Sequence, residues 1–87
     1  MTAIILNARE LGQALRAERK ALGRSQHDLA LGADCRRQTI LDLEAGKNVS
    51  LNTLMATLAA LGKGLAIIDA RPDIDQISSL LDPADED

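Results

Sequence analysis

The chain has 87 residues, enough for one small domain, and 46% of them are apolar. Ala and Leu supply 29 of the 40 apolar residues, while Phe, Tyr and Trp are absent. A core made of helix-favouring aliphatic side chains predicts an all-α domain. The missing aromatic residues exclude RNA-recognition sheets and single-strand binders, because both stack bases on aromatic rings.

The net charge of −3 conceals two oppositely charged parts of the chain. Residues 1–71 hold ten Lys and Arg against seven Asp and Glu, whereas residues 72–87 hold six acids and no base. The body is therefore mildly basic and the tail strongly acidic. The sequence shows no signal-peptide pattern, no membrane-spanning apolar run and only one cysteine, Cys35, so we expect a cytoplasmic protein without disulfides.

The first helix is expected from about residue 7 to residue 22. Asn7 followed by Glu10 has the form of a capping box, and Gly23 stops the pattern. Apolar residues at helical spacing indicate the face that should be buried. They are Ala8, Leu11, Ala14, Leu15, Ala21 and Leu22.

Three shorter helices are expected to follow. A second capping box begins at Ser25 and opens a helix over about residues 25–33. Residues 38–45 form the third helix, which ends at a glycine, and Ser50 caps a fourth over residues 51–61. Together with the first helix they make a four-helix domain over residues 7–62.

The segment after the fourth helix has a different character. Two glycines precede Leu65-Ala66-Ile67-Ile68-Asp69-Ala70, a short β-branched run that predicts a strand. A single strand in a helical monomer leaves its backbone groups unpaired, so the expected partner is the same strand of a second copy. Residues 63–71 thus form the predicted dimerisation strand, through Leu65, Ala66, Ile67 and Ile68. Residues 3–6 fit either a further strand or a hydrophobic lead-in to the first helix.

The third helix carries two kinds of side chain on opposite sides. At about 100° per residue, Ile40 and Leu43 face inward. The outward side offers a guanidinium, an amide, an apolar tip and a carboxylate, the groups that read base edges in a DNA major groove. They belong to Arg37, Gln38, Leu41 and Asp42. This pattern alone fits an ordinary solvated helix face equally well.

The spacing of the second and third helices favours DNA binding. A capped helix from Ser25, a tight turn near Asp34 and a second short helix from about Arg37 form a helix-turn-helix. Over residues 11–61 the chain resembles the Xre/Cro family of phage-repressor-like DNA-binding domains. The motifs that carry the resemblance are Leu15-x3-Arg19-x3-Gly23-x-Ser25-Gln26-x2-Leu29-Ala30, Thr39-Ile40-x2-Leu43-Glu44-x-Gly46 and Leu51-x2-Leu54.

Within this family the chain is most similar to the HipB-type antitoxins. The predicted strand replaces the helices that other members carry after Leu61, and Arg36 stands where most relatives have a Ser cap. The resemblance implies a lambda-repressor-like domain of four to five helices with a C-terminal β-strand for dimerisation. It also implies a homodimeric, nucleoid-associated repressor that binds double-stranded operator DNA and neutralises a HipA-like serine/threonine kinase toxin.

Two alternatives remain: a stand-alone Xre-family regulator without a toxin partner, and an interaction module that has lost DNA binding. The basic cluster of residues 36–38 argues against the second. No enzyme activity, cofactor or metal is expected, because the sequence offers no catalytic triad and His27 has no second ligand for zinc. No membrane or small-molecule partner is expected either.

The resemblance also assigns roles to single residues. Leu41, on the outward side of the third helix, is a further base-reading candidate, and Lys47 and Asn48 follow that helix, where DNA phosphates are expected. The resemblance itself implies base readout by Arg36, Arg37, Gln38 and Asp42, and phosphate contacts by Ser25 and Gln26. It further pairs Arg19 with Glu44 inside the body. Arg24 and Ala45 depart from the pattern, since relatives usually have an apolar residue and an Asn at these positions.

Residues 72–87 form an acidic tail that the resemblance does not cover. Four apolar residues recur there at helical spacing, which predicts a short amphipathic helix that orders only against a partner surface. They are Ile74, Ile77, Leu80 and Leu81. A toxin contact and an inert solubilising tail are both compatible with this pattern.

Overall fold

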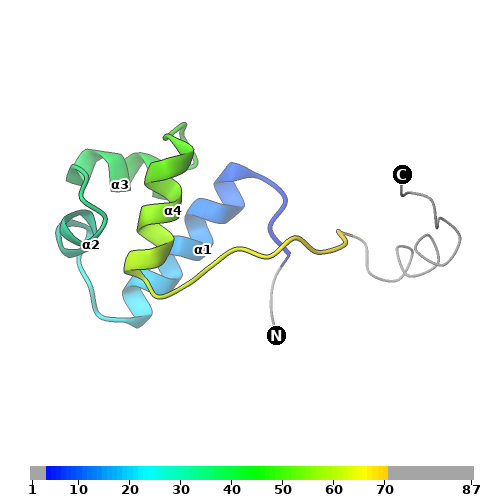
Figure 1. Ribbon diagram of the computed structural model, residues 1–87, viewed down its shortest axis with the longest axis horizontal. Coiled ribbons are helices and arrows are strands. Elements are labelled where there is room, and N and C mark those ends of the chain that lie inside the picture. Colours follow the sequence, from blue (N-terminus) through cyan, green and yellow to red (C-terminus); the bar gives the residue numbers. More distant parts are fainter. Residues whose placement is uncertain (1–3, 71–87) are drawn as a thin grey trace, which may run out of the picture.

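The computed structural model describes residues 4–70 of the chain. Four helices make up the body: α1 (Ala8–Ala21), α2 (Gln26–Gly32), α3 (Arg37–Glu44) and α4 (Leu51–Ala60). α3 packs against both α1 and α2, and α4 packs against α2 (Figure 1). The predicted order and position of the four helices are confirmed, with ends that differ by one or two residues.

Three of the four helices begin with the side-chain caps that the sequence predicts. The capping residues are Asn7 for α1, Ser25 for α2 and Ser50 for α4. At α2 the capping box is complete, because the Asp28 carboxylate also accepts from the Ser25 backbone N–H. This hydrogen bond stabilises the charged carboxylate and lowers the pKa of Asp28. Helices this short are not stable by themselves in water, and the caps stabilise their N-terminal ends.

The core lies where the four helices meet. Its buried members are Leu15, Leu29, Ala30, Ile40, Leu43, Leu58 and Leu61, with Leu11, Cys35, Val49, Leu54 and Ala60 partly buried against them. All of these side chains are small or aliphatic. Because the core is small, the folding stability of the domain depends strongly on close packing between the helices.

The predicted buried stripe of α1 is wrong at three positions. Leu22 is 49% exposed, and Ala8 and Ala21 are exposed as well. The residues that α1 buries are Gly12, Leu15 and Arg19. The helix therefore turns a face with a glycine and an arginine toward the body, because α1 crosses the C-terminal end of α3 at these positions.

Gly12 allows this close crossing. A Cβ atom at position 12 would lie 2.5 Å from the carbonyl oxygen of Leu43 and 2.6 Å from that of Glu44. Both atoms belong to the backbone, so they could not move aside without shifting α3. A second close approach follows at Gly46, where φ is +82° and a Cβ would lie 2.8 Å from the Arg9 Cα. Two glycines thus set the distance between α1 and the end of α3.

Arg19 and Glu44 meet across this contact, as the family pattern implied. The Arg19 Nε donates to Glu44 Oε2 at 2.7 Å, and Nη2 donates to Oε1 at 3.1 Å. The two residues are only 7% and 9% exposed. The hydrogen bond that Arg19 donates to Glu44 raises the pKa of Arg19, although burial opposes the shift. The pair is bidentate, which is the geometry in which a guanidinium and a carboxylate hold each other most firmly.

Residues 63–70 leave the helical body as an extended segment (Figure 1). No strand occurs within residues 4–70, so the predicted C-terminal strand is not formed in the single chain. The physical reason is that no backbone within residues 4–70 pairs with the segment. Residues 4–6 form no ladder with it, although Ile5 and Leu65 line the same open pocket of about 460 Å³. The side chains of Leu65, Ile67 and Ile68 are more than half exposed.

The tail residues Ile74, Ile77, Leu80 and Leu81 lie outside the described part of the chain. None of the helices within residues 4–70 is long and apolar enough to span a membrane.

Replacing Arg19 by Ala should lower the free energy of unfolding by about 3–5 kcal/mol, because Glu44 would stay buried without its counter-charge. Urea unfolding of the full chain measures the change. Glu18→Ala is the matched control, since it removes an ion pair to Lys63 whose side chains are half exposed, and it should change stability little. An unchanged urea midpoint for Arg19→Ala would show that the pair does not hold α1 to α3.

Candidate nucleic-acid interface

α2 and α3 are joined by a tight turn over residues 33–36. Asp34 adopts a left-handed conformation with φ 56°, which reverses the chain. The backbone N–H of Cys35 donates to the carbonyl of Ala30 at 3.0 Å and so closes the end of α2. The Cys35 side chain is half buried, and desolvation raises the pKa of its thiol. The turn therefore directs α3 away from α2 and gives Cys35 a packing role.

α3 is seated on the body by its apolar side. Ile40 is completely buried and Leu43 is 5% exposed. Arg37 and Gln38 are exposed, and Leu41 and Asp42 are half buried at the border of the same surface. The inward side deduced from the sequence is thus confirmed at Ile40 and Leu43. The outward side is exposed at Arg37 and Gln38 and only partly exposed at Leu41 and Asp42.

Arg36 occupies the N-cap position of α3 but does not cap it. Its backbone is extended, with φ −83° and ψ 154°, and no side-chain hydrogen bond reaches the first turn. A capping Ser or Asp at such a position typically stabilises a helix by about 1 kcal/mol. The chain forgoes that stabilisation and instead places a second exposed guanidinium beside Arg37.

Asp42 is engaged by Gln38 one turn earlier. The Gln38 Nε2 donates to Asp42 Oδ1 at 2.9 Å. Because a carboxylate can only accept, the amide nitrogen must face Asp42 and the amide oxygen faces away from it. Asp42 therefore orients Gln38, a role that the assignment to base readout did not foresee.

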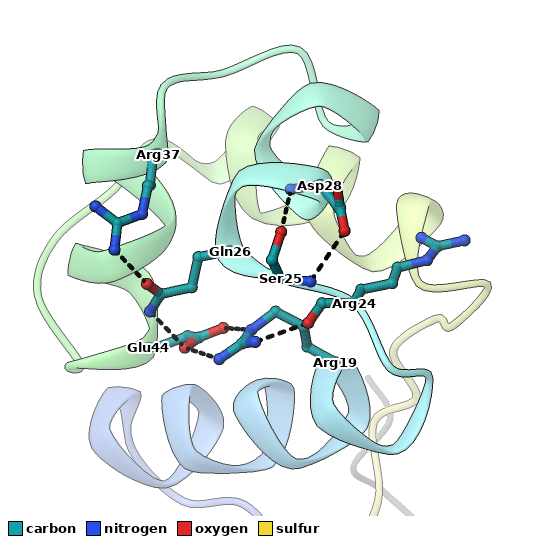
Figure 2. A network of polar contacts seen from close by, with 7 residues as sticks. All are labelled: Arg19, Arg24, Ser25, Gln26, Asp28, Arg37 and Glu44. Carbon is teal, nitrogen blue, oxygen red and sulfur yellow. Dashed lines mark hydrogen bonds and ion pairs between the residues drawn. The ribbon is translucent and has the colours of Figure 1, made fainter.

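A chain of polar contacts runs from the outer surface of α3 into the core (Figure 2). The Arg37 Nη2 donates to Gln26 Oε1 at 3.3 Å, and the Gln26 Nε2 donates to Glu44 Oε1 at 3.2 Å. Glu44 is in turn held by Arg19. The sequence suggested Gln26 only as a phosphate contact. Sequence spacing could not predict this bridge between helices, because Gln26 is 11 positions from Arg37 and 18 positions from Glu44.

Arg24 extends the same network toward α4. Its backbone carbonyl accepts from Arg19 Nη1 at 2.9 Å, and its own guanidinium donates to the carbonyl of Ala60 in the last turn of α4. The unusual basic residue thus satisfies a carbonyl that the helix end leaves open. The α1–α2 loop is tied by it to the point where the extended segment begins.

The expected phosphate contacts lie at both flanks of α3. Lys47 and Asn48 are exposed just after α3, and the Lys47 backbone N–H donates to the carbonyl of Asp42. Ser25 is exposed at the start of α2, where its hydroxyl oxygen is occupied by the cap. His27 is exposed beside it, and no cluster of metal-ligating side chains occurs among residues 4–70.

Comparison with known proteins places this arrangement in a family. A helix-turn-helix family model matches residues 15–68, more than half of the chain. The chain belongs to the Xre-type helix-turn-helix family. This confirms the resemblance inferred from the sequence motifs. No curated protein matches the chain at a significant level.

Solved structures of the family share the fold. A complex of a HipB variant with an O2 20mer is 25% identical, covers 82% of this chain and 100% of that chain, and has a TM-score of 0.76. A chain of a HipA-HipB-O2-O3 complex is 24% identical, covers 80% of this chain and 100% of that chain, and has a TM-score of 0.74. The clp gene regulator ClgR from C. glutamicum is 30% identical, covers 75% of this chain and 85% of that chain, and has a TM-score of 0.63. The chain is a helix-turn-helix DNA-binding regulator whose fold is similar to that of HipB.

The uncapped start of α3 gives a direct test of the role of Arg36. Arg36→Ser should raise the free energy of unfolding by about 0.5–1 kcal/mol, because the serine hydroxyl can accept a hydrogen bond from a backbone N–H in the first turn of α3. The same change should weaken DNA binding, since a guanidinium is lost. Urea unfolding and fluorescence anisotropy measure the two effects.

Arg36→Ala is the matched variant, because it removes the guanidinium without supplying a cap. It should weaken DNA binding as much as Arg36→Ser but leave the protein less stable than the Ser variant. Equal stability of the two variants would mean that α3 gains nothing from a cap.

Proposed function

We propose that this protein is a homodimeric transcriptional repressor that acts as the antitoxin of a HipA-like serine/threonine kinase. It binds double-stranded operator DNA through α3 and represses its own operon. The observation that carries the proposal is the row of exposed guanidinium and amide groups on a short helix whose opposite side is buried. The likeness to HipB in complex with an O2 20mer supports the same reading.

Each outward side chain of α3 suits a particular base edge. Arg37 can donate two hydrogen bonds to O6 and N7 of a guanine, and Gln38 can make a bidentate pair with an adenine. Leu41 offers an apolar contact to a thymine methyl group, and Arg36 adds a second guanidinium at the start of the helix. With Asp42 holding one amide hydrogen, Gln38 still has one hydrogen and its oxygen available for the adenine.

Phosphate contacts on both sides of α3 would fix the helix in the groove. Ser25 and Gln26 begin α2, where backbone N–H groups and the helix dipole favour an anion. Lys47 and Asn48 follow α3 and are exposed on its other flank. Such contacts give affinity without sequence preference, and they make binding sensitive to salt.

Base and phosphate roles predict different mutant behaviour. Arg37→Ala should cost about 1–3 kcal/mol on operator DNA and much less on random DNA, because a base contact is lost. Lys47→Ala should weaken binding to operator and random DNA alike, and it should reduce the slope of log affinity against log salt concentration by about one. Anisotropy titrations over a salt series, with the DNA upstream of the gene as operator, measure all four affinities. Equal losses on both DNAs for Arg37→Ala would remove that residue from base readout.

The dimer is proposed to form through residues 65–68. Ile67 is fully exposed, and the backbone of this extended segment has no partner among residues 4–70. Pairing with the same segment of a second copy would bury the Ile67 side chain and supply hydrogen-bond partners for the backbone. A two-fold axis would then let two α3 helices reach half-sites about 34 Å apart on one face of DNA.

Proline at position 67 should break the dimer, because it removes a backbone donor from the pairing segment. Sedimentation equilibrium of Ile67→Pro should give a monomer, whereas Ile67→Val, which keeps the donor and a β-branched side chain, should remain a dimer. A proline variant that stays a tight dimer would move the interface to another surface.

The kinase partner is proposed from the likeness to HipB, which occurs together with HipA in one similar structure. The acidic tail is the segment best suited to a protein surface, because its charge repels DNA. Truncation after Arg71 should therefore weaken binding to a HipA-like kinase encoded beside this gene, measured by calorimetry. DNA binding of the truncated protein serves as the control and should not fall. Undiminished kinase binding would assign the contact to the helical body.

A stand-alone Xre-family regulator is the second candidate, and the 30% identity to the regulator ClgR favours it. The two candidates differ in one observable. An antitoxin co-purifies with the kinase of its own operon, whereas a stand-alone regulator has no such neighbour gene and binds its operator without a protein partner.

A further inference from the structure

Residues 60–63 join α4 to the extended segment, and two side-chain contacts from other parts of the body reach this joint. We propose that Arg24 and the ion pair of Glu18 with Lys63 are positioning residues that fix the joint. They thereby set the spacing of the two DNA half-sites that the protein accepts. The inference rests on the proposed function, namely on a dimer through residues 65–68 that places two α3 helices on DNA.

The backbone of the joint decides where the extended segment leaves the body. Gly62 turns the chain with φ +73°, a conformation that glycine adopts without strain. The backbone N–H of Lys63 then donates to the carbonyl of Leu58 at 2.9 Å and closes the end of α4. Residues 64–70 are exposed and have no regular secondary structure. The direction of the segment is therefore set at the joint and not further along the chain.

The first contact on the joint comes from the loop between α1 and α2. The Arg24 guanidinium donates to the carbonyl of Ala60, and the Arg24 backbone carbonyl accepts from Arg19 Nη1 at 2.9 Å. Arg19 is paired in turn with Glu44 on α3 (Figure 2). A short path of polar contacts thus connects the joint with the recognition helix.

The second contact on the joint comes from α1. The Lys63 Nζ lies 3.3 Å from Glu18 Oε1, and about half of each side chain is exposed. Such a pair adds little to the free energy of unfolding. It can still select one direction for the segment, because the glycines at positions 62 and 64 leave the backbone beside Lys63 many others. Loss of the pair should therefore change the geometry of the dimer more than its stability.

The stiffness of the joint matters because a longer DNA spacer moves and rotates a half-site together. One added base pair shifts the half-site by about 3.4 Å along the DNA axis and turns it by about 35°. A body held firmly on the pairing segment loses contacts when its half-site moves in this way. A flexible joint lets each body follow its half-site. Discrimination between spacer lengths therefore reports how firmly the joint is held.

Operators that differ only in spacer length test the first contact. The DNA upstream of the gene, and versions with one base pair added to or removed from the spacer, are titrated with the full chain by fluorescence anisotropy. Arg24→Met keeps an apolar stem and removes the donors. We expect it to lower the ratio of natural-spacing to altered-spacing affinity about 2- to 10-fold, the range for one lost hydrogen bond. Lys20→Met, matched in charge at an exposed position of α1, should leave that ratio unchanged.

An exchange of charges tests the second contact. Glu18→Lys and Lys63→Glu each place two like charges at the joint, and each should lower the same ratio about 1.5- to 5-fold, the range for an exposed ion pair. The double variant restores an opposite pair and should recover the ratio. The ratio is compared because each single change also alters the net charge, which shifts the affinity for DNA of any spacing.

A further readout does not depend on DNA. Spin labels at Lys47→Cys, in a Cys35→Ala background that removes the native thiol, report the distance between the ends of the two α3 helices in the free dimer. The distance distribution should be narrow when Arg24 is present and broader in Arg24→Met. Sedimentation equilibrium verifies that both proteins are dimers.

Four results would overturn the proposal, and they differ from one another. An unchanged spacing ratio for Arg24→Met with a reduced salt slope would make Arg24 a phosphate contact alone. An unchanged width of the distance distribution, or a double charge variant that recovers nothing, would show that the contacts do not hold the joint. A dimer that binds all three spacings equally would contradict this inference and leave the proposed function intact. A full chain that sediments as a monomer would remove the proposed dimer, and the inference with it.

Discussion

The contact between α1 and the C-terminal end of α3 is the constraint on which the rest of the structure depends. Gly12 brings the backbones together, and the buried pair of Arg19 with Glu44 fixes them at that distance. A buried ion pair of this kind is a weak source of net stability, since desolvation offsets much of the attraction. Its value is geometric, because a guanidinium and a carboxylate paired through two hydrogen bonds tolerate little rotation. The pair therefore specifies how α3 sits on the body.

Much of the fold follows from local signals in the sequence. Side-chain caps at Asn7, Ser25 and Ser50 and stops at glycines fix the helix order, and each signal acts within four residues of the chain. The two sides of α3 also follow from periodicity, because Ile40 and Leu43 are its large inward apolar residues. Local rules are sufficient where the feature is local.

Other features depend on what one helix presents to another, and no spacing rule contains that information. Periodicity gave α1 an apolar stripe that included Leu22, but the helix buries a glycine and an arginine because it crosses the backbone of α3. The Gln26 bridge joins two helices and a buried carboxylate. The proposed pairing of residues 65–70 requires groups that residues 4–70 of a single chain do not supply. Helix geometry placed Arg19 and Glu44 near the inward sides of their helices, and the family pattern paired them with each other.

The two ends of α3 are built in opposite ways, and the difference fits the demands of reading DNA. The C-terminal end is held by Gly12, Gly46 and the buried pair, and it has little freedom. The N-terminal end has no side-chain cap, and it carries two exposed guanidinium groups, those of Arg36 and Arg37. A recognition helix contacts base edges mainly with its N-terminal residues, so that end needs reach and charge while the far end needs a fixed position. Stability given up at Arg36 is compatible with folding because the opposite end of the same helix is over-determined. Substitutions at the C-terminal end should accordingly change stability first, and those at the N-terminal end should change recognition first.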